Sequence, residues 1–187
     1  GLSCAESVDL VRKAKANGIH VTADVHAEQL LFNETHVLDF DVNFKFMPVL
    51  RRQSDRIALW EGIKDGTIDS IVSNHRPFDK EEKDVEFDHA SFGNITLQSL
   101  FGSLSTVKEF DLELVVSILS DRNRKILGLD AAPIEVGQKA DLTFFFPNQK
   151  WTLNKEDIVS ATYNSPFIGK ELTGNVLGIL NNGKLAI

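Results

Sequence analysis

Helical and strand-like patterns alternate through the first part of the chain, and this alternation constrains the fold more than any other feature. Two helical patterns are separated by strand-like segments, and each helix leads into a strand. This order at this spacing predicts βα units around a parallel sheet. The predicted elements are a helix over 3–17, a strand over 19–25, a strand-like segment over 37–46, a helix over 54–66 and a strand over 68–72.

Helix-capping signals mark the ends of both helices. Ser3-Cys-Ala-Glu6 matches a capping box, in which the Ser3 oxygen and the Glu6 carboxylate satisfy free backbone amides, and Asn17-Gly18 is a typical end signal. Ser54-Asp55 is predicted to cap the second helix, which ends at Gly66. The residues of that helix spaced for burial are Ile57, Ala58 and Ile63.

The second part of the chain changes character. The charged stretch 79–92 is predicted to be a solvated loop, and helical patterns follow near 95–104, 111–119 and 121–127. A β-rich region begins at Ala131, with a strand-like run at 142–146, a turn at Pro147-Asn148 and two final strands joined by Asn181-Asn-Gly183, a strong hairpin signal. We therefore predict an α/β fold in which residues 1–130 form barrel-type units and residues 131–187 a small β-rich domain.

Composition excludes several classes of protein. The 187 residues suffice for one sizeable domain with a small appendage, and the net charge of −7 disfavours general affinity for nucleic acid or an anionic membrane. The apolar runs are far shorter than a membrane span requires. A single cysteine, Cys4, excludes an internal disulfide and fits a reducing cytoplasm. Because the chain opens at Gly1 without an initiator methionine, we expect a longer natural product.

The strand over 68–72 ends in a polar cluster, Ser73-Asn-His-Arg-Pro-Phe78, at the place where parallel-sheet enzymes carry their chemistry. An amide such as that of Asn74 cannot act as a general base near neutral pH. The phenyl ring of Phe78 can neither ligate a metal nor accept a hydrogen bond. The cluster therefore has the position of an active site, but neither Asn74 nor Phe78 can supply acid–base or metal chemistry there.

Several segments in order resemble the dihydroorotase family of the amidohydrolase superfamily. Asn43-Phe-Lys-Phe-Met-Pro-Val-Leu-Arg51 is similar to a family segment Asn-x-Lys-x-x-Pro-Pro-Leu-Arg, with Val49 in place of the second proline. Each match is weak alone, but the order makes the resemblance strong. The other matching segments are 65–69, 81–84, 91–93, 137–142, 165–169 and 182–184.

The resemblance implies the second half of a (β/α)8 TIM-type barrel followed by a small β-sandwich-type domain. It places Asn74 at the position of the family's metal-binding, proton-moving Asp, and His26-Ala-Glu-Gln29 at a Thr-Pro-His-His segment that contains a metal ligand. Gly1-Leu-Ser-Cys4 stands where another ligand histidine would precede a Ser-Thr pair. No cofactor is therefore expected. The family substrate contacts that remain are Asn43, Phe92 and Gly93.

An alternative interpretation of the sequence retains a metal site. In a strand of period two, Asp24, His26 and Glu28 would project from one face and could hold a divalent ion, zinc by family resemblance, in a displaced site. A solvated strand end is the competing interpretation. His75 keeps its family position, and its expected role is to orient a neighbouring backbone group.

Three functions remain open. The first is a catalytically inactive, structural or regulatory dihydroorotase-like protein that associates with aspartate transcarbamoylase, with the missing N-terminal half of its barrel and, as a homo-oligomer, with itself. The second is an active metal-dependent dihydroorotase whose remaining ligands lie in that missing half. The third is a module that keeps Asn43 and Gly93 to bind a pyrimidine precursor.

Overall fold

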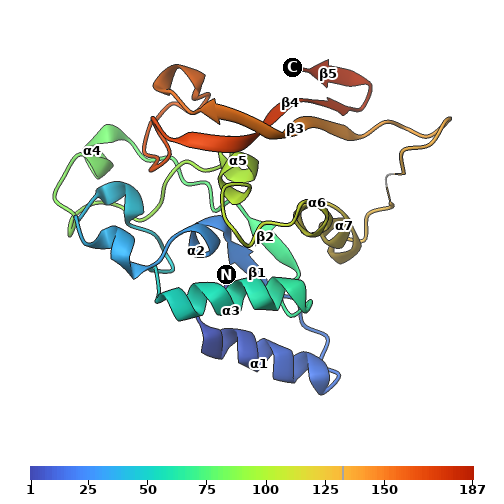
Figure 1. Ribbon diagram of the computed structural model, residues 1–187, viewed down its shortest axis with the longest axis horizontal. Helices are drawn as coiled ribbons and strands as arrows, with labels where there is room; N and C mark the ends of the chain where they lie inside the picture. The colour runs from blue at the N-terminus through green and yellow to red at the C-terminus, as the bar shows by residue number, and fades with distance from the viewer. Residues whose placement is uncertain (132) are drawn as a thin grey trace.

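The computed structural model describes residues 1–131 and 133–187 (Figure 1). A two-stranded sheet of β1 (Asp24–His26) and β2 (Ser70–Val72) lies among helices, and a three-stranded sheet of β3 (Leu142–Thr152), β4 (Glu171–Asn181) and β5 (Lys184–Ala186) lies above them. The α-helices are α1 (Ala5–Ala16), α2 (Ala27–Leu31), α3 (Gln53–Lys64), α4 (Lys80–Lys83), α5 (Leu100–Leu104), α6 (Leu112–Leu119) and α7 (Asp121–Ile126). The 3-10 helices are η1 (Glu34–Val37), η2 (Val42–Phe44) and η3 (Lys155–Asp157).

Strands β1 and β2 are parallel, which confirms the predicted parallel pairing. Val25 lies opposite Ile71 in the register, and both side chains are buried. Leu2 adds one parallel bridge on the other side of Val25. The strands are shorter than predicted, and their carboxyl ends lie side by side, so the polar residues that follow each strand meet there.

The strand predicted over 37–46 is wrong, because this segment forms η1 and η2. Short polar side chains turn the chain at both places: Asn33 Oδ1 accepts a hydrogen bond from the Thr35 amide (3.1 Å), and Asp41 Oδ1 accepts one from the Asn43 amide (2.8 Å). Such local bonds compete with a strand ladder. The phenylalanines of this region pack on one another instead, with the rings of Phe32 and Phe44 meeting edge to face at 5.0 Å.

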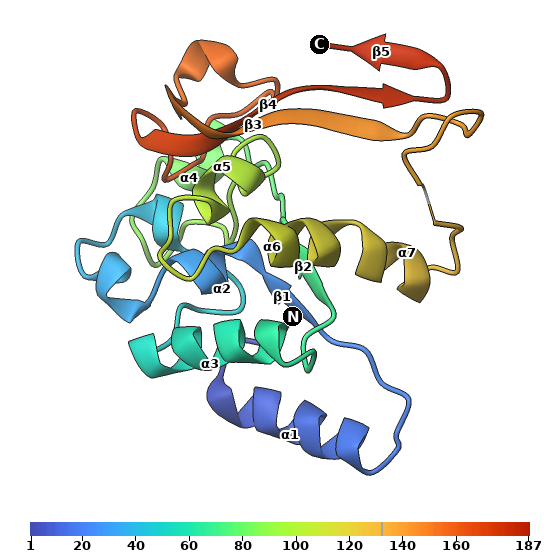
Figure 2. The same cartoon turned by 45° about the vertical axis from the view of Figure 1, so that its right-hand side comes forward.

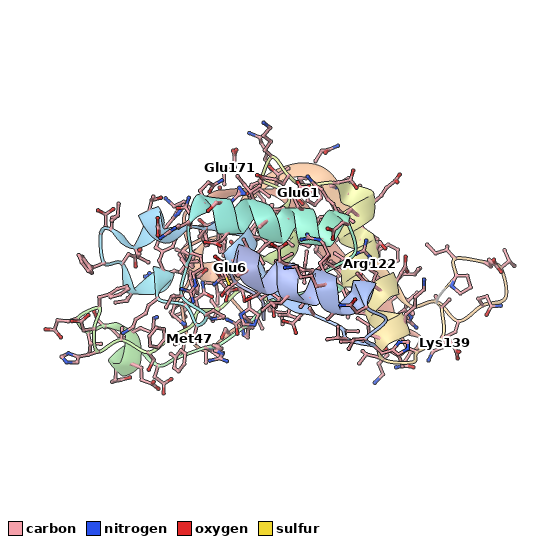
Figure 3. All side chains as sticks on the ribbon, turned by 90° about the horizontal axis from the view of Figure 1, so that it is seen from below. Glu6, Met47, Glu61, Arg122, Lys139 and Glu171 are labelled. Carbon is pink, nitrogen blue, oxygen red and sulfur yellow. The ribbon has the colours of Figure 1, made fainter. Side chains whose placement is uncertain are left out.

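One carboxylate joins the beginnings of α1 and α3. The predicted capping box at Ser3 is not formed; Cys4 is the N-cap of α1, and the Ala5 amide donates instead to Asp55 Oδ1 (2.9 Å). The other oxygen of Asp55 accepts from the Arg52 amide (3.2 Å), so α3 begins slightly earlier than predicted. Asp55 therefore fixes two helices that lie side by side in Figure 3, where Glu6 and Glu61 mark α1 and α3.

The main core surrounds the parallel strands. Helices α1 and α3 lie below the strands and α5 and α6 lie on the other side (Figure 2), and buried side chains from all four helices belong to the same core cluster. Trp60 is fully buried, and its indole N–H donates to the Leu30 carbonyl (3.1 Å). Ile63 is buried as predicted, but Ile57 is 47% exposed, because the buried face of α3 runs through Leu59, Trp60, Gly62 and Ile63.

The three-stranded sheet is antiparallel, and the predicted hairpin between its last two strands is confirmed. Asn182 and Gly183 both have positive φ, 49° and 73°, as the tightest hairpin turns require. The predicted turn at Pro147-Asn148 is wrong: both residues lie within β3, where the register shifts between Phe146 and Lys150. A proline inside a strand is tolerated at such irregularities.

Residues 79–92 are not one solvated loop, because they contain the short helix α4 and the buried side chain of Lys83.

The predicted helices over 111–119 and 121–127 correspond to α6 and α7, and Gly128 follows with φ 65°. The helix predicted over 95–104 begins only at Leu100. In the described residues, no helix is long and apolar enough to cross a membrane.

Candidate functional site

Asn74 lies immediately after β2, at the carboxyl end of the parallel sheet. Its backbone has a positive φ of 48°, a conformation that asparagine tolerates better than most residues. Its side-chain amide donates one hydrogen bond to Glu28 Oε1 and a longer one to the Met47 carbonyl (3.4 Å). The amide therefore acts as a hydrogen-bond donor toward Glu28.

Glu28 belongs to α2 and not to β1. The strand ends at His26 and the helix begins at Ala27, so the predicted single strand face of Asp24, His26 and Glu28 is wrong. The period of two stops where the helix starts. Glu28 turns inward and is only 1% exposed, with His26 Nδ1 at 3.6 Å from its Oε1.

The acceptor atoms at this strand end are poorly satisfied. Glu28 Oε2, His26 Nδ1 and Asp24 Oδ1 are buried and make no hydrogen bond within the described residues, although the amino group of Gly1 lies 3.0 Å from Asp24 Oδ1. In this part of the chain no three His, Cys, Asp or Glu side chains are grouped so that they could hold a metal ion. The side chain of Asn74 also points its N–H group toward Glu28. A metal ion bound beside Glu28 would instead need an atom with a free lone pair at that place. The residues present do not fit a zinc ion by themselves.

His75 orients a neighbouring backbone, as the sequence predicted. Its Nδ1 accepts hydrogen bonds from the amides of Thr96 (3.1 Å) and Leu97 (3.2 Å). Accepting at Nδ1 assigns the ring proton to Nε2 in the neutral imidazole. The histidine thus holds residues 96–97 against the end of β2.

The backbone of Gly93 is fully engaged by the protein. Its N–H donates to the Lys45 carbonyl (2.8 Å), and its own carbonyl accepts from Lys83 Nζ (3.1 Å). Its φ of 135° and an added Cβ at 2.7 Å from Arg76 Cβ both require glycine here. The neighbouring Phe92 ring lies 4.7 Å from Lys45 Nζ. These two predicted substrate contacts stay predictions, and the geometry gives each of them a structural role.

Lys83 is a buried cation that the sequence did not reveal. Its Nζ also donates to the carbonyls of Val42 (2.7 Å) and Ser91 (2.9 Å), so it joins α4 to η2 and to the loop that contains Ser91 and Gly93. Burial, together with the positive charge of Lys45, lowers the pKa of Lys83 to about 8. The only hint was its position in the matching segment 81–84, since a lysine in a charged run is ordinarily solvated.

The predicted binding residues do not share one cavity. Asn43 lines a cavity of about 530 Å³ with Phe78 and Tyr163. Phe92 lines a second cavity, of about 340 Å³, and Asn74 lines neither of these two. The structure therefore brings Asn74 to Glu28, whereas Asn43 and Phe92 line different cavities.

The match to a known family covers almost all of the chain. A family model described as Amidohydrolase family matches residues 2–186. The chain belongs to this family. It is 40% identical over 188 residues to a dihydroorotase of Caldicellulosiruptor saccharolyticus and 37% identical over 189 residues to a dihydroorotase of Bacillus subtilis. Those alignments cover 98% and 99% of this chain, but the chain spans only 44% of the length of either relative.

Solved structures of amidohydrolases share the fold. A D-hydantoinase from Bacillus sp. AR9 superimposes with a TM-score of 0.85 at 26% identity, over 100% of this chain and 44% of that one. The inactive dihydroorotase-like domain of the Chaetomium thermophilum CAD-like multifunctional protein superimposes with a TM-score of 0.71, over 99% of this chain and 49% of that one. At 19% identity this second likeness concerns the fold alone.

Proposed function

We propose that this chain is the second half of a dihydroorotase-like protein of pyrimidine biosynthesis that has kept the amidohydrolase fold without the hydrolytic reaction. The hydrogen bond between the Asn74 amide and the buried Glu28 carboxylate carries the proposal. By the resemblance to the family, these two positions belong to its Asp and to its Thr-Pro-His-His segment. Here they bind each other.

The chemistry of cyclic amide hydrolysis explains why the residues at these two positions matter. Opening or closing a cyclic amide near neutral pH needs an activated water, a polarised carbonyl and a group that moves a proton. In metal-dependent hydrolysis, zinc supplies the first two and an adjacent carboxylate supplies the third. An amide cannot move the proton, and Glu28 is already engaged by Asn74.

The architecture proposed for the whole protein is a (β/α)8 barrel of which residues 1–130 are the later units, with residues 131–187 in the small β-rich domain. The fraction of its relatives that the chain spans supports this arrangement. Two parallel strands also leave both sheet edges without a full neighbouring strand, which a closed barrel would supply. The rest of the barrel is thus the first partner.

The proposed role is structural or regulatory, with aspartate transcarbamoylase as the partner and self-association into a homo-oligomer. A barrel can present an interface on its outer surface without any active site, because the two occupy different faces. The existence of a protein described as an inactive dihydroorotase-like domain supports such a role in principle.

A second candidate is an active, zinc-dependent dihydroorotase. The identity of about 40% to dihydroorotases favours it, as do the open acceptor atoms of His26 and Glu28, which could complete a site with ligands from the rest of the barrel. Fold likeness alone does not decide between the two candidates.

Turnover of dihydroorotate by the purified full-length protein distinguishes the candidates. We expect no hydrolysis above the rate of a blank, with or without added zinc, for the wild type and for Asn74→Asp alone, because the two segments His26-Ala-Glu-Gln29 and Gly1-Leu-Ser-Cys4 still lack the histidines of the family. A zinc-dependent rate in the wild type would refute the proposal and support the second candidate.

A further inference from the structure

Two separate loops carry the same short pattern of an apolar residue, an acid, a phenylalanine and an acid. The first is Leu38-Asp-Phe-Asp41 and the second is Val85-Glu-Phe-Asp88. No lysine or arginine occurs within residues 33–44 or 84–92. The loops meet where the rings of Phe40 and Phe87 lie edge to face, with centroids 5.7 Å apart. These eight residues are called the acidic aromatic surface below.

The apolar side chains of this surface are unusually exposed. Leu38 is 71% exposed and Phe40 is 68% exposed. Phe40 also has a φ of 53°, a left-handed conformation that is strained for an aromatic residue. Folding has not used this ring to fill the core, and strained residues of this kind concentrate at binding sites.

A cavity adjoins the surface and offers room for an inserted side chain. It has a volume of about 340 Å³ and is walled mainly by phenylalanines and aliphatic residues. Figure 3 places Met47, which is 46% exposed, on the same side of the molecule as α4. The residues that line the cavity are Val37, Phe44, Lys45, Phe46, Val49, Leu50, Phe87, Asp88 and Phe92.

The cavity wall is held in place before any partner arrives. Lys45 Nζ donates to the carbonyls of Phe87 (2.6 Å) and Asp88 (2.9 Å) and lies 5.3 Å from the Phe87 ring centroid. These contacts use the donors of the Lys45 ammonium group within the wall. A preformed wall reduces the entropy that binding costs.

The acidic aromatic surface beside the cavity carries four acids, while the cavity wall itself contains Asp88 and the cation Lys45. The acids Asp39, Asp41, Glu86 and Asp88 are all exposed. Within the described residues Asp39, Asp41 and Asp88 form no ion pair, and the Glu86 carboxylate has only His89 at 3.7 Å. A mainly apolar cavity beside a cluster of exposed carboxylates complements a chain segment that carries an apolar anchor between lysines or arginines.

We propose that the acidic aromatic surface docks a basic segment of a partner protein, which inserts an apolar side chain beside Phe40 into the adjoining cavity. The inference deepens the proposed scaffold role by giving the chemistry of the partner. It is separable from that role, because binding of a basic segment and turnover of dihydroorotate are measured independently.

The test uses the full-length protein and a fluorescent amphipathic peptide with leucines on one helical face and lysines on the other. We expect Phe40→Asn to weaken binding by about tenfold, the loss typical of a removed aromatic anchor. Phe144→Asn is the matched control, since Phe144 is an exposed phenylalanine on β3, and it should leave the affinity unchanged. Asn tolerates the positive φ at residue 40, so urea unfolding should show that Phe40→Asn is at least as stable as the wild type.

Charge reversal gives a second, independent readout. Asp39→Lys should weaken binding and flatten its salt dependence, whereas Glu113→Lys, an exposed acid on α6, should do neither. Equal affinity of Phe40→Asn and Phe144→Asn overturns the proposal. Failure of the full-length protein to bind the peptide also overturns it, because the rest of the polypeptide would then cover the surface. A dimer in analytical ultracentrifugation that Phe40→Asn dissociates overturns it as well, because the occupant would then be a second copy of the protein.

Discussion

The two sheets of the molecule differ in how they are covered. The parallel pair is short, yet helices pack on it from two sides and Val25 and Ile71 are almost fully buried. The antiparallel sheet is much longer, yet Phe144, Phe146 and Leu185 on its strands are 42%, 52% and 58% exposed. Helix α5 covers part of one face of that sheet, where the rings of Phe101 and Phe145 lie 4.8 Å apart.

The difference shows where the stability of this chain resides. Burial of apolar area is the main stabilising term in folding, and it is concentrated around β1 and β2. The antiparallel sheet contributes a small separate cluster of Leu153, Phe167 and Leu172. The first region is therefore expected to be sensitive to substitution, and the second to be tolerant of it.

Trp60→Ala is expected to have the largest effect. It removes a fully buried side chain from the core around the parallel strands and leaves the Leu30 carbonyl without its indole donor. Such truncations cost about 3–5 kcal/mol of unfolding free energy. Urea denaturation of the full-length protein measures this loss of unfolding free energy. A loss as small as that caused by substituting an exposed residue would contradict this account of the core.

Asn74→Asp is expected to come next, with a loss of about 2 kcal/mol, because it replaces a donor with a second carboxylate facing the buried Glu28. The exchanged pair Glu28→Gln with Asn74→Asp restores a donor and an acceptor. The double variant should therefore lose less unfolding free energy than the two single variants lose in sum. Additive effects in this double-mutant cycle would show that the two side chains are not coupled.

Lys83 should make stability depend on pH in the alkaline range. Its pKa is about 8 in the folded protein and 10.5 ordinarily, so between these values the folded state binds fewer protons than the unfolded state. The free energy of unfolding should therefore rise as the pH increases from about 8 to 10.5, by at most about 1.4 kcal/mol per pH unit. Lys83→Met should abolish this rise, whereas Lys80→Met, on the same helix but exposed, should retain it.

Phe146→Ser on the antiparallel sheet should have the smallest effect, below about 0.5 kcal/mol, because its ring is half exposed and covers little of the core. The same urea titration applies. A loss as large as that of Trp60→Ala would mean that another part of the protein covers this face in the full-length product.

The features predicted correctly from sequence depend on local patterns. Short apolar runs located β1 and β2, and Asn182-Gly183 located a hairpin because two successive positive φ values favour those residues. The segment 37–46 was misjudged because its apolar residues suit a strand, while the side chains of Asn33 and Asp41 form turns. Local hydrogen bonds there outweighed β propensity.

The candidate site was harder to predict because its contacts join distant parts of the chain. The sequence singles out Asn74, but its partner Glu28 lies 46 residues away, at a helix start that the strand pattern conceals. The Val42 carbonyl that holds Lys83 lies 41 residues away in sequence. Neither spacing has a signature in a single sequence, since tertiary packing alone brings such groups together.

The zinc content of the purified full-length protein, measured after incubation with zinc and desalting into zinc-free buffer, tests the central claim most directly. If the Asn74 amide has taken the place of a cation beside Glu28, the protein should retain far less than one equivalent of zinc. Retention of one or more equivalents, lost on substitution of Glu28 or His26, would contradict it.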